Sequence, residues 1–281
     1  MNLVGVNLAV DSGGRYKLIY GRKSGNEFLH KSEKLIKNLI LIVLMLVLWE
    51  VLSRTGLVDA SILPPISKIA KGGYKLFSTG KILNDIWDSL RRVLLGFSIA
   101  MLIGIPVGVL IGYYETFSDI VTPLVNIFRQ VPAMALYPVF LLFFGIGEES
   151  KIAIVFWVSL WPILLNTVSG VKHVDKLLIK AARSMGATNL RILFTVIVPG
   201  IIPQLMTGIR LGAGSAVVSL VAAEMIGARS GLGFMVTNTQ YNFQIPEMYV
   251  SILTIAMLGI LINNTLVYTE KRISFWSEDN L

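Results

Sequence analysis

The sequence contains no cysteine, and its 281 residues include only two histidines. The absence of cysteine excludes a disulfide framework, thiolate metal sites and a cysteine nucleophile. Because His30 and His173 are the only histidines, we expect neither a metal site nor a catalytic residue. Charged residues are also scarce, at 15%, against 54% hydrophobic residues and a mean hydropathy of +0.70. These values indicate a membrane protein and exclude a disordered chain or an ordinary secreted domain.

Long stretches with little or no charge divide the chain. A membrane-spanning helix needs roughly 20 apolar residues, and six segments meet that need. The first span is expected at 35–53, and the others at about 92–114, 121–145, 152–171, 200–226 and 248–270. Residues 1–34 are then an N-terminal tail, 54–91 an outer loop, 92–271 the core and 272–281 a C-terminal tail. The expected fold class is an all-α integral membrane protein.

The lysines and arginines between the spans set the orientation. With the N-terminus inside, the cytoplasmic segments hold fourteen of these residues and the outer segments nine. The positive-inside rule therefore places both termini in the cytoplasm, and it explains the net charge of +8 without a nucleic-acid partner. In the outer loop, residues 66–77 are expected to form a short amphipathic helix after the break at Pro64-Pro65.

Three glycines recur at four-residue intervals in the second span, at Gly104, Gly108 and Gly112. They leave one face of that helix without side chains, which predicts close packing against a neighbouring helix. Glycine is also common in membrane helices in general. Both interpretations concern architecture rather than chemistry.

Residues 174–186, between the fourth and fifth spans, show the period of an amphipathic helix outside the bilayer. The apolar positions are Val174, Leu177, Leu178, Ala181, Ala182 and Met185. The stripe ends at Gly186, and Val198-Pro199-Gly200 is expected to break the chain before the fifth span. Such a helix could dock closely against another protein, or it could lie on the membrane surface.

The segment from Lys180 to Gly186, Lys-Ala-Ala-Arg-Ser-Met-Gly, with Pro199 following in Val-Ile-Val-Pro, resembles the signature loop of binding-protein-dependent ABC importer permeases. That signature begins with Glu-Ala-Ala, so the chain departs from it at Lys180. The resemblance implies a coupling loop over 172–199 that docks on an ATPase. The residues expected to make or shape this contact are Leu178, Lys180, Ala181, Ala182, Arg183, Gly186 and Pro199.

Further motifs, spread over roughly residues 50–275, resemble the nitrate, sulfonate and taurine importer permeases. They are Ser89-Leu90-Arg91-Arg92-Val93, Gly104-Ile105-Pro106-Val107-Gly108, Phe144-Gly145-Ile146-Gly147-Glu148, Ala222-Ala223-Glu224-Met225-Ile226 and Gly231-Leu232-Gly233-Phe234. The resemblance implies the type I ABC importer permease fold, with six transmembrane helices and a cytoplasmic coupling helix. It also implies that the protein lies in a bacterial inner membrane, where lipid surrounds its helices. It also implies three partners: a second permease copy, an external substrate-binding protein and cytoplasmic ATPase subunits.

The chain lacks the G-x-x-x-x-G-K-[ST] phosphate-binding loop of such ATPases. Its only Gly-Lys pair, Gly80-Lys81, is followed by isoleucine. ATP and magnesium are therefore expected on the partner ATPase, and this chain is expected to bind no cofactor and to be no enzyme. By resemblance its substrate is a small anion such as nitrate or a sulfonate, with bicarbonate-like ions and heteroaromatic precursors left open.

Polar residues inside the expected spans are candidates for the substrate pathway, because a charge there costs roughly 2.5–3.5 kcal/mol. They are Arg129, Gln130, Arg210 and Glu224. Two guanidinium groups could attract an oxyanion. The alternatives are snorkelling of the arginines to lipid headgroups, or pairing with a carboxylate such as Glu224. Glu224 could also shape an outer gate.

Two other classes of function compete with an ATP-driven importer. A secondary transporter or channel suits apolar spans equally well, but it has no reason to keep the spacing of the docking loop, and no inverted repeat is visible. An intramembrane hydrolase is disfavoured, because Ser230 lies in a G-x-x-S-G loop and neither histidine falls in a span to act as a base.

Overall fold

The computed structural model describes residues 6–10, 16–20, 24–59 and 61–273. The chain divides into two compact units, residues 1–67 and 68–281. In the first unit, strand β1 (Val6–Val10) pairs antiparallel with strand β2 (Tyr16–Tyr20). This hairpin was not expected from the sequence. The part of the C-terminal tail from residue 274 onward lies outside the described residues.

Helix α1 (Ser24–Arg54) contains the first expected span, 35–53. Its apolar side chains from Ile40 to Leu48 are 45% to 64% exposed, which suits contact with lipid tails. At its end, Trp49 Nε1 donates a hydrogen bond to the carbonyl oxygen of Pro64 at 3.1 Å. This bond ties the end of α1 to the loop that follows.

The described part of residues 68–281 is helical. Its elements are α2 (Ile66–Ser78, which begins in the first unit), α3 (Lys81–Tyr113), α4 (Glu115–Phe128), α5 (Ala133–Phe144), α6 (Glu148–His173), α7 (Lys176–Ser184), α8 (Asn189–Ile192), the π-helical turn η1 (Leu193–Ile197), α9 (Val198–Gly227), α10 (Leu232–Tyr241) and α11 (Ile245–Ile273). Helix α2 matches the amphipathic helix expected at 66–77.

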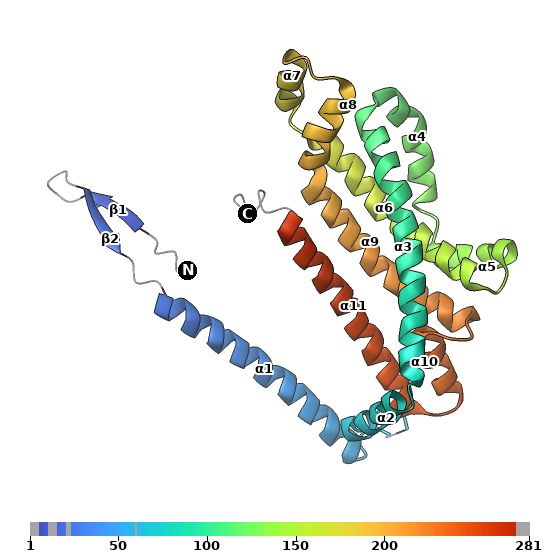
Figure 1. The fold of residues 1–281 in the computed structure, drawn as a ribbon. Helices are drawn as coiled ribbons and strands as arrows, with labels where there is room; N and C mark the ends of the chain where they lie inside the picture. The colour runs from blue at the N-terminus through green and yellow to red at the C-terminus, as the bar shows by residue number, and fades with distance from the viewer. Residues whose placement is uncertain (1–5, 11–15, 21–23, 60, 274–281) are drawn as a thin grey trace. The chain divides into compact units, whose positions relative to one another are not determined.

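Helices α3, α6 and α9 lie side by side and form the core of this unit (Figure 1). Buried apolar side chains fill the space between them, among them Val93 from α3, Ile154 and Val155 from α6, and Leu220 from α9. The loop that carries α7 and α8 lies at one end of this bundle, and α10 lies at the other end (Figure 1).

The three glycines of α3 lie against α6. A Cβ atom added at Gly108 would lie 2.7 Å from Thr167 Cβ, and one added at Gly112 would lie 2.5 Å from Val171 Cβ. At Gly104 the nearest atom would be Leu160 Cδ1, at 3.2 Å. Glycine therefore lets the two helix backbones approach more closely than any larger residue would allow.

Four helices in the described part of the chain are long and apolar enough to cross a membrane: α3, α6, α11 and the run Asn189–Gly227. The expected third span, 121–145, is instead a pair of helices, α4 and α5, which meet at an angle of 94° and would make a fifth span if counted together. Pro132, at the break, disfavours a helical conformation in the residue before it. The number of six spans stays a prediction.

Two expected boundaries differ in the structure. Helix α3 begins at Lys81, so the last part of the expected outer loop 54–91 is helical. The expected break at Val198-Pro199-Gly200 is wrong, because Asn189–Gly227 is one helical run. Pro199 fits there because it lies in the first turn of α9, directly after the π-helical turn η1, where the hydrogen-bond register already changes.

Candidate functional site

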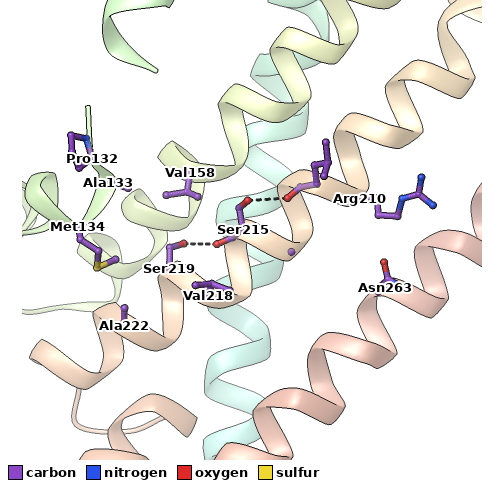
Figure 2. Close-up of a pocket in the computed structure, with 12 residues that line it drawn as sticks. Pro132, Ala133, Met134, Val158, Arg210, Ser215, Val218, Ser219, Ala222 and Asn263 are labelled. Carbon is purple, nitrogen blue, oxygen red and sulfur yellow. Dashed lines mark hydrogen bonds between the residues drawn. The ribbon is translucent and has the colours of Figure 1, made fainter. Parts of the chain in front are cut away.

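A cavity of about 860 Å³ lies between α9 and the segments around it. Its wall is mainly apolar, with Pro132 and Ala133 from the start of α5, Val158 from α6 and Val218 from α9 (Figure 2). Its polar side chains are Arg210, Ser215, Ser219 and Asn263. The two serine hydroxyl groups donate hydrogen bonds to backbone carbonyl oxygens of α9 itself. Among the residues that the structure describes, Arg210 is the only charged one that lines the cavity.

Arg210 forms an ion pair with Glu270 of α11, with Nη1 and Oε2 3.1 Å apart. The arginine side chain is 38% exposed and the glutamate side chain 23%, so water or a solute can reach the pair. The structure therefore agrees with the alternative in which Arg210 pairs with a carboxylate, but the carboxylate is that of Glu270 and not that of Glu224. Glu224 is 1% exposed and binds another arginine.

That other arginine is Arg92, whose side chain is 2% exposed near the start of α3. Its Nη1 donates to Glu224 Oε1 at 2.6 Å. Its Nε and Nη2 donate to the two carboxylate oxygens of Glu148, at 2.6 and 2.7 Å. Nη1 also donates to the carbonyl oxygen of Ser230 at 2.8 Å. One guanidinium therefore connects α3, α6, α9 and the loop before α10.

The same cluster caps the N-terminus of α10. The backbone N–H groups of Gly231, Leu232 and Gly233 donate to side chains of Asp85, Ser89 and Glu224, at 2.8, 2.9 and 2.9 Å respectively. A helix N-terminus leaves such N–H groups without partners inside the helix. Gly231 has a φ of +113°, a conformation that favours glycine. We call Asp85, Ser89, Arg92, Glu148, Glu224 and Ser230 the polar cluster.

At the opposite end of the bundle, α7 has defined caps. The Asp175 side chain accepts a hydrogen bond from the Leu177 N–H at 2.7 Å. At the C-terminus Gly186 has a φ of +78°. The N–H groups of Gly186 and Ala187 donate to the carbonyl oxygens of Arg183 and Ala182, both at 3.0 Å. This is a Schellman cap, for which glycine is the preferred residue.

The two sides of α7 face different surroundings. Leu177, Leu178 and Met185 are 69%, 56% and 81% exposed. The apolar stripe predicts Ala182 beside them, whereas Ala182 is 7% exposed and packs against the chain's own core, formed with Ile192 and other residues. The apolar stripe of α7 therefore has a buried side at Ala182 and an exposed side at Leu177, Leu178 and Met185. Only the exposed side is free to contact another protein.

A comparison with protein families matches residues 104–274 to the binding-protein-dependent transport system inner membrane component. The chain belongs to this family. It is therefore the membrane-spanning permease component of an ATP-driven, binding-protein-dependent ABC importer.

Individual relatives agree with this assignment. An ABC transporter permease of Brucella abortus (strain 2308) is 37% identical over 230 residues, which cover 82% of this chain and 91% of the relative. The taurine transport system permease protein TauC of Escherichia coli (strain K12) is 32% identical, with 84% and 87% covered. The nitrate import permease protein NrtB of Synechocystis is 28% identical, with 89% and 92% covered.

Among solved structures, the permease is similar to a chain of the MetNI methionine ABC transporter in an inward-facing conformation. The TM-score is 0.62 at 23% sequence identity, and the match covers 68% of this chain and 95% of that chain. This similarity shows the type I ABC importer permease fold.

Two further predicted pathway residues of the permease, Arg129 and Gln130, lie at the break between α4 and α5. Both are exposed, and both side chains donate to Asn126, Arg129 Nε to its Oδ1 at 3.1 Å and Gln130 Nε2 to its carbonyl oxygen at 2.9 Å. They do not line the cavity, although Pro132, two residues on, does. Their role in the pathway stays a prediction.

The polar cluster was not predicted as a unit, although the motifs that carry the family resemblance supply most of it. Asp85, Ser89 and Arg92 follow one another at i, i+4 and i+7, which places them on one face of a helix. That spacing was a usable signal. A single helix face was not predicted, because Asp85 and Ser89 fall in the expected outer loop 54–91 and Arg92 in the expected span 92–114. In the described part of the chain, no group of three histidine, aspartate or glutamate residues could hold a metal ion.

Proposed function

We propose that this permease carries a small solute with an anionic group, such as nitrate or a sulfonate of the taurine type, through the cavity that Arg210 lines. The observation that supports this most directly is a guanidinium, 38% exposed, in an otherwise uncharged cavity wall between helices that suit a membrane. Two relatives are named for the transport of taurine and of nitrate. Taurine has a sulfonate group, and both sulfonate and nitrate are oxyanions. A guanidinium binds such oxyanions through two parallel N–H donors.

Glu270 keeps the guanidinium neutralised when no substrate is present. Because the Arg210 and Glu270 side chains are 38% and 23% exposed, an incoming sulfonate or nitrate can reach the guanidinium N–H donors and displace the carboxylate. Among the described residues, the rest of the cavity wall is uncharged, so the anion meets no second cation there. Binding to one cation leaves the anion able to dissociate, which transport requires.

Replacing Arg210 with glutamine tests the pathway. Loss of one charge-assisted contact, worth roughly 1.5–3 kcal/mol, should lower ATP-driven uptake about tenfold to hundredfold in proteoliposomes. Assembly with the ATPase should be unchanged. Arg54→Gln is the matched control, since it breaks an exposed arginine–glutamate pair of 2.7 Å in the first unit and should leave uptake unchanged. Normal uptake by Arg210→Gln would contradict the proposal.

We also propose the partners of the permease. It works as a dimer of identical chains, receives its substrate from an external binding protein, and docks through the exposed side of α7 on cytoplasmic ATPase subunits that hold ATP and magnesium. Both chain termini then lie in the cytoplasm. Leu177, Leu178 and Met185 supply the apolar contact, with Lys180, Ala181 and Arg183 exposed beside them.

Three other residues of the coupling loop act within the permease, and only the first of them, Ala182, is buried. Ala182 fits α7 closely onto the chain's own core, and Gly186 allows the chain to turn after α7. Pro199 lies where the loop joins the long helix α9. A short helix that is held at both ends against the spans can transmit a displacement to them.

A further inference from the structure

A second cavity, of about 810 Å³, lies between α7 and the turn that joins α3 to α4. Figure 1 shows these segments at the same end of the second unit. The charged side chains that line the cavity are Glu115, Asp119, Lys172, Lys176, Lys180 and Arg183. We call this cavity the basic groove, because four cations face two carboxylates.

The charges of the basic groove are not compensated locally. Among the described residues, none of these six side chains forms an ion pair within 4 Å. The Lys172 ammonium donates a hydrogen bond to a neutral group, the Ser118 hydroxyl, at 3.1 Å. Two positive charges in excess, in a cavity of this volume, favour an anionic ligand.

The remaining wall of the groove suits a ligand with an apolar part. Ile111, Val171 and Ile197 line it from the ends of the spans. Tyr113 and Tyr114, with ring centroids 4.9 Å apart, also line it. Tyrosine is enriched at the level of the lipid headgroups, so the groove has the chemistry of the membrane surface.

We propose that the basic groove binds the phosphate group of an anionic phospholipid. The lysines act as point charges and Arg183 as a two-pronged donor to the phosphate oxygens, while the apolar wall contacts the glycerol and the first methylene groups. A lipid bound here would connect α7 to the α3–α4 turn and hold the coupling loop in place. This proposal rests on the proposed function in one respect, which is that α7 lies on the cytoplasmic side of the membrane.

Lipid retention by the purified full chain tests this proposal. The chain is incubated in neutral detergent with equal amounts of phosphatidylglycerol and phosphatidylcholine, and bound lipid is measured by native mass spectrometry. We expect retention of phosphatidylglycerol to exceed that of phosphatidylcholine about tenfold. The double variant Lys172→Gln with Lys176→Gln should lower phosphatidylglycerol retention about tenfold. Each lysine near an anionic lipid surface adds to the binding free energy, and both contributions are lost.

The matched control is Lys68→Gln with Lys71→Gln, which removes two exposed lysines of α2 and should leave lipid retention unchanged. Lys172 also donates a hydrogen bond to Ser118, so its replacement could change the stability of the fold. The single variant Lys176→Gln avoids this, because the Lys176 side chain is exposed. It should lose less phosphatidylglycerol than the double variant, at an unchanged melting temperature. Equal retention of the two lipids, or full retention by the double variant, would overturn the proposal.

A third arm distinguishes lipid from free phosphate. Inorganic phosphate at millimolar concentration should leave phosphatidylglycerol bound. If phosphate displaces the lipid and binds to the chain alone, the lipid assignment is wrong. The experiment contains no ATPase, so its failure would leave the proposed docking of α7 unaffected.

Discussion

Replacing Arg92 with methionine is expected to destabilise the permease by roughly 3–5 kcal/mol, because it leaves Glu224 buried without its cationic partner. Glu224 is 1% exposed, so water cannot replace the guanidinium. Glu148, the other carboxylate that Arg92 binds, is 49% exposed and should tolerate the loss. The expected result is a large fall in the melting temperature of the purified protein, with loss of monodisperse material.

Two further variants isolate the cause. Arg91→Met changes the neighbouring arginine, which is exposed, and should alter the melting temperature little. Adding Glu224→Gln to Arg92→Met removes the buried charge and keeps an acceptor for the Gly233 N–H, so part of the stability should return. If Arg92→Met melts like Arg91→Met, the polar cluster does not hold the helices together.

Replacing Leu178 with aspartate is expected to abolish ATPase binding without unfolding the permease. The Leu178 side chain is 56% exposed in the isolated chain, so a carboxylate there remains hydrated. In a contact with the ATPase the same carboxylate would be buried without a partner, at a cost of roughly 2–5 kcal/mol. Recovery of the ATPase in a pull-down should therefore fall more than tenfold, and uptake should be lost.

Leu57→Asp is the matched control for that experiment. Leu57 is 76% exposed and lies outside the coupling loop, in the first unit. Its replacement should leave ATPase recovery normal. Normal recovery with Leu178→Asp would instead support the alternative in which α7 lies on the membrane surface.

Local patterns predicted much of the structure. The 3.6-residue period indicated α7, and the glycine at 186 marked its end, because both features depend on residues within a few positions of one another. The glycines at four-residue intervals in α3 lie against α6, as helix geometry requires. The assignment of α7 and its neighbours to an ATPase-docking loop stays a prediction.

Contacts between residues far apart in the sequence were not predictable in the same way. Arg92 and Glu224 are 132 positions apart, and nothing in either neighbourhood specifies the partner. Arg92 is the first residue of the expected span 92–114, and a carboxylate from α9 makes its burial possible. The choice of Glu270 over Glu224 as the partner of Arg210 likewise depends on how α11 packs on α9.

The burial of Ala182 shows a further limit of pattern analysis. Periodicity indicates which side of a helix is apolar but not which surface covers it. In α7 the stripe faces the chain's own core at Ala182 and is open at Leu178.

The most direct test of the central claim is transport by purified components in sealed proteoliposomes. The permease, reconstituted with its ATPase and supplied with its binding protein outside and ATP inside, should accumulate nitrate or a sulfonate such as taurine against a gradient. The permease alone should hydrolyse no ATP and accumulate nothing. ATP hydrolysis by the isolated permease after removal of contaminants, or uptake driven by an ion gradient without ATP, would contradict the account.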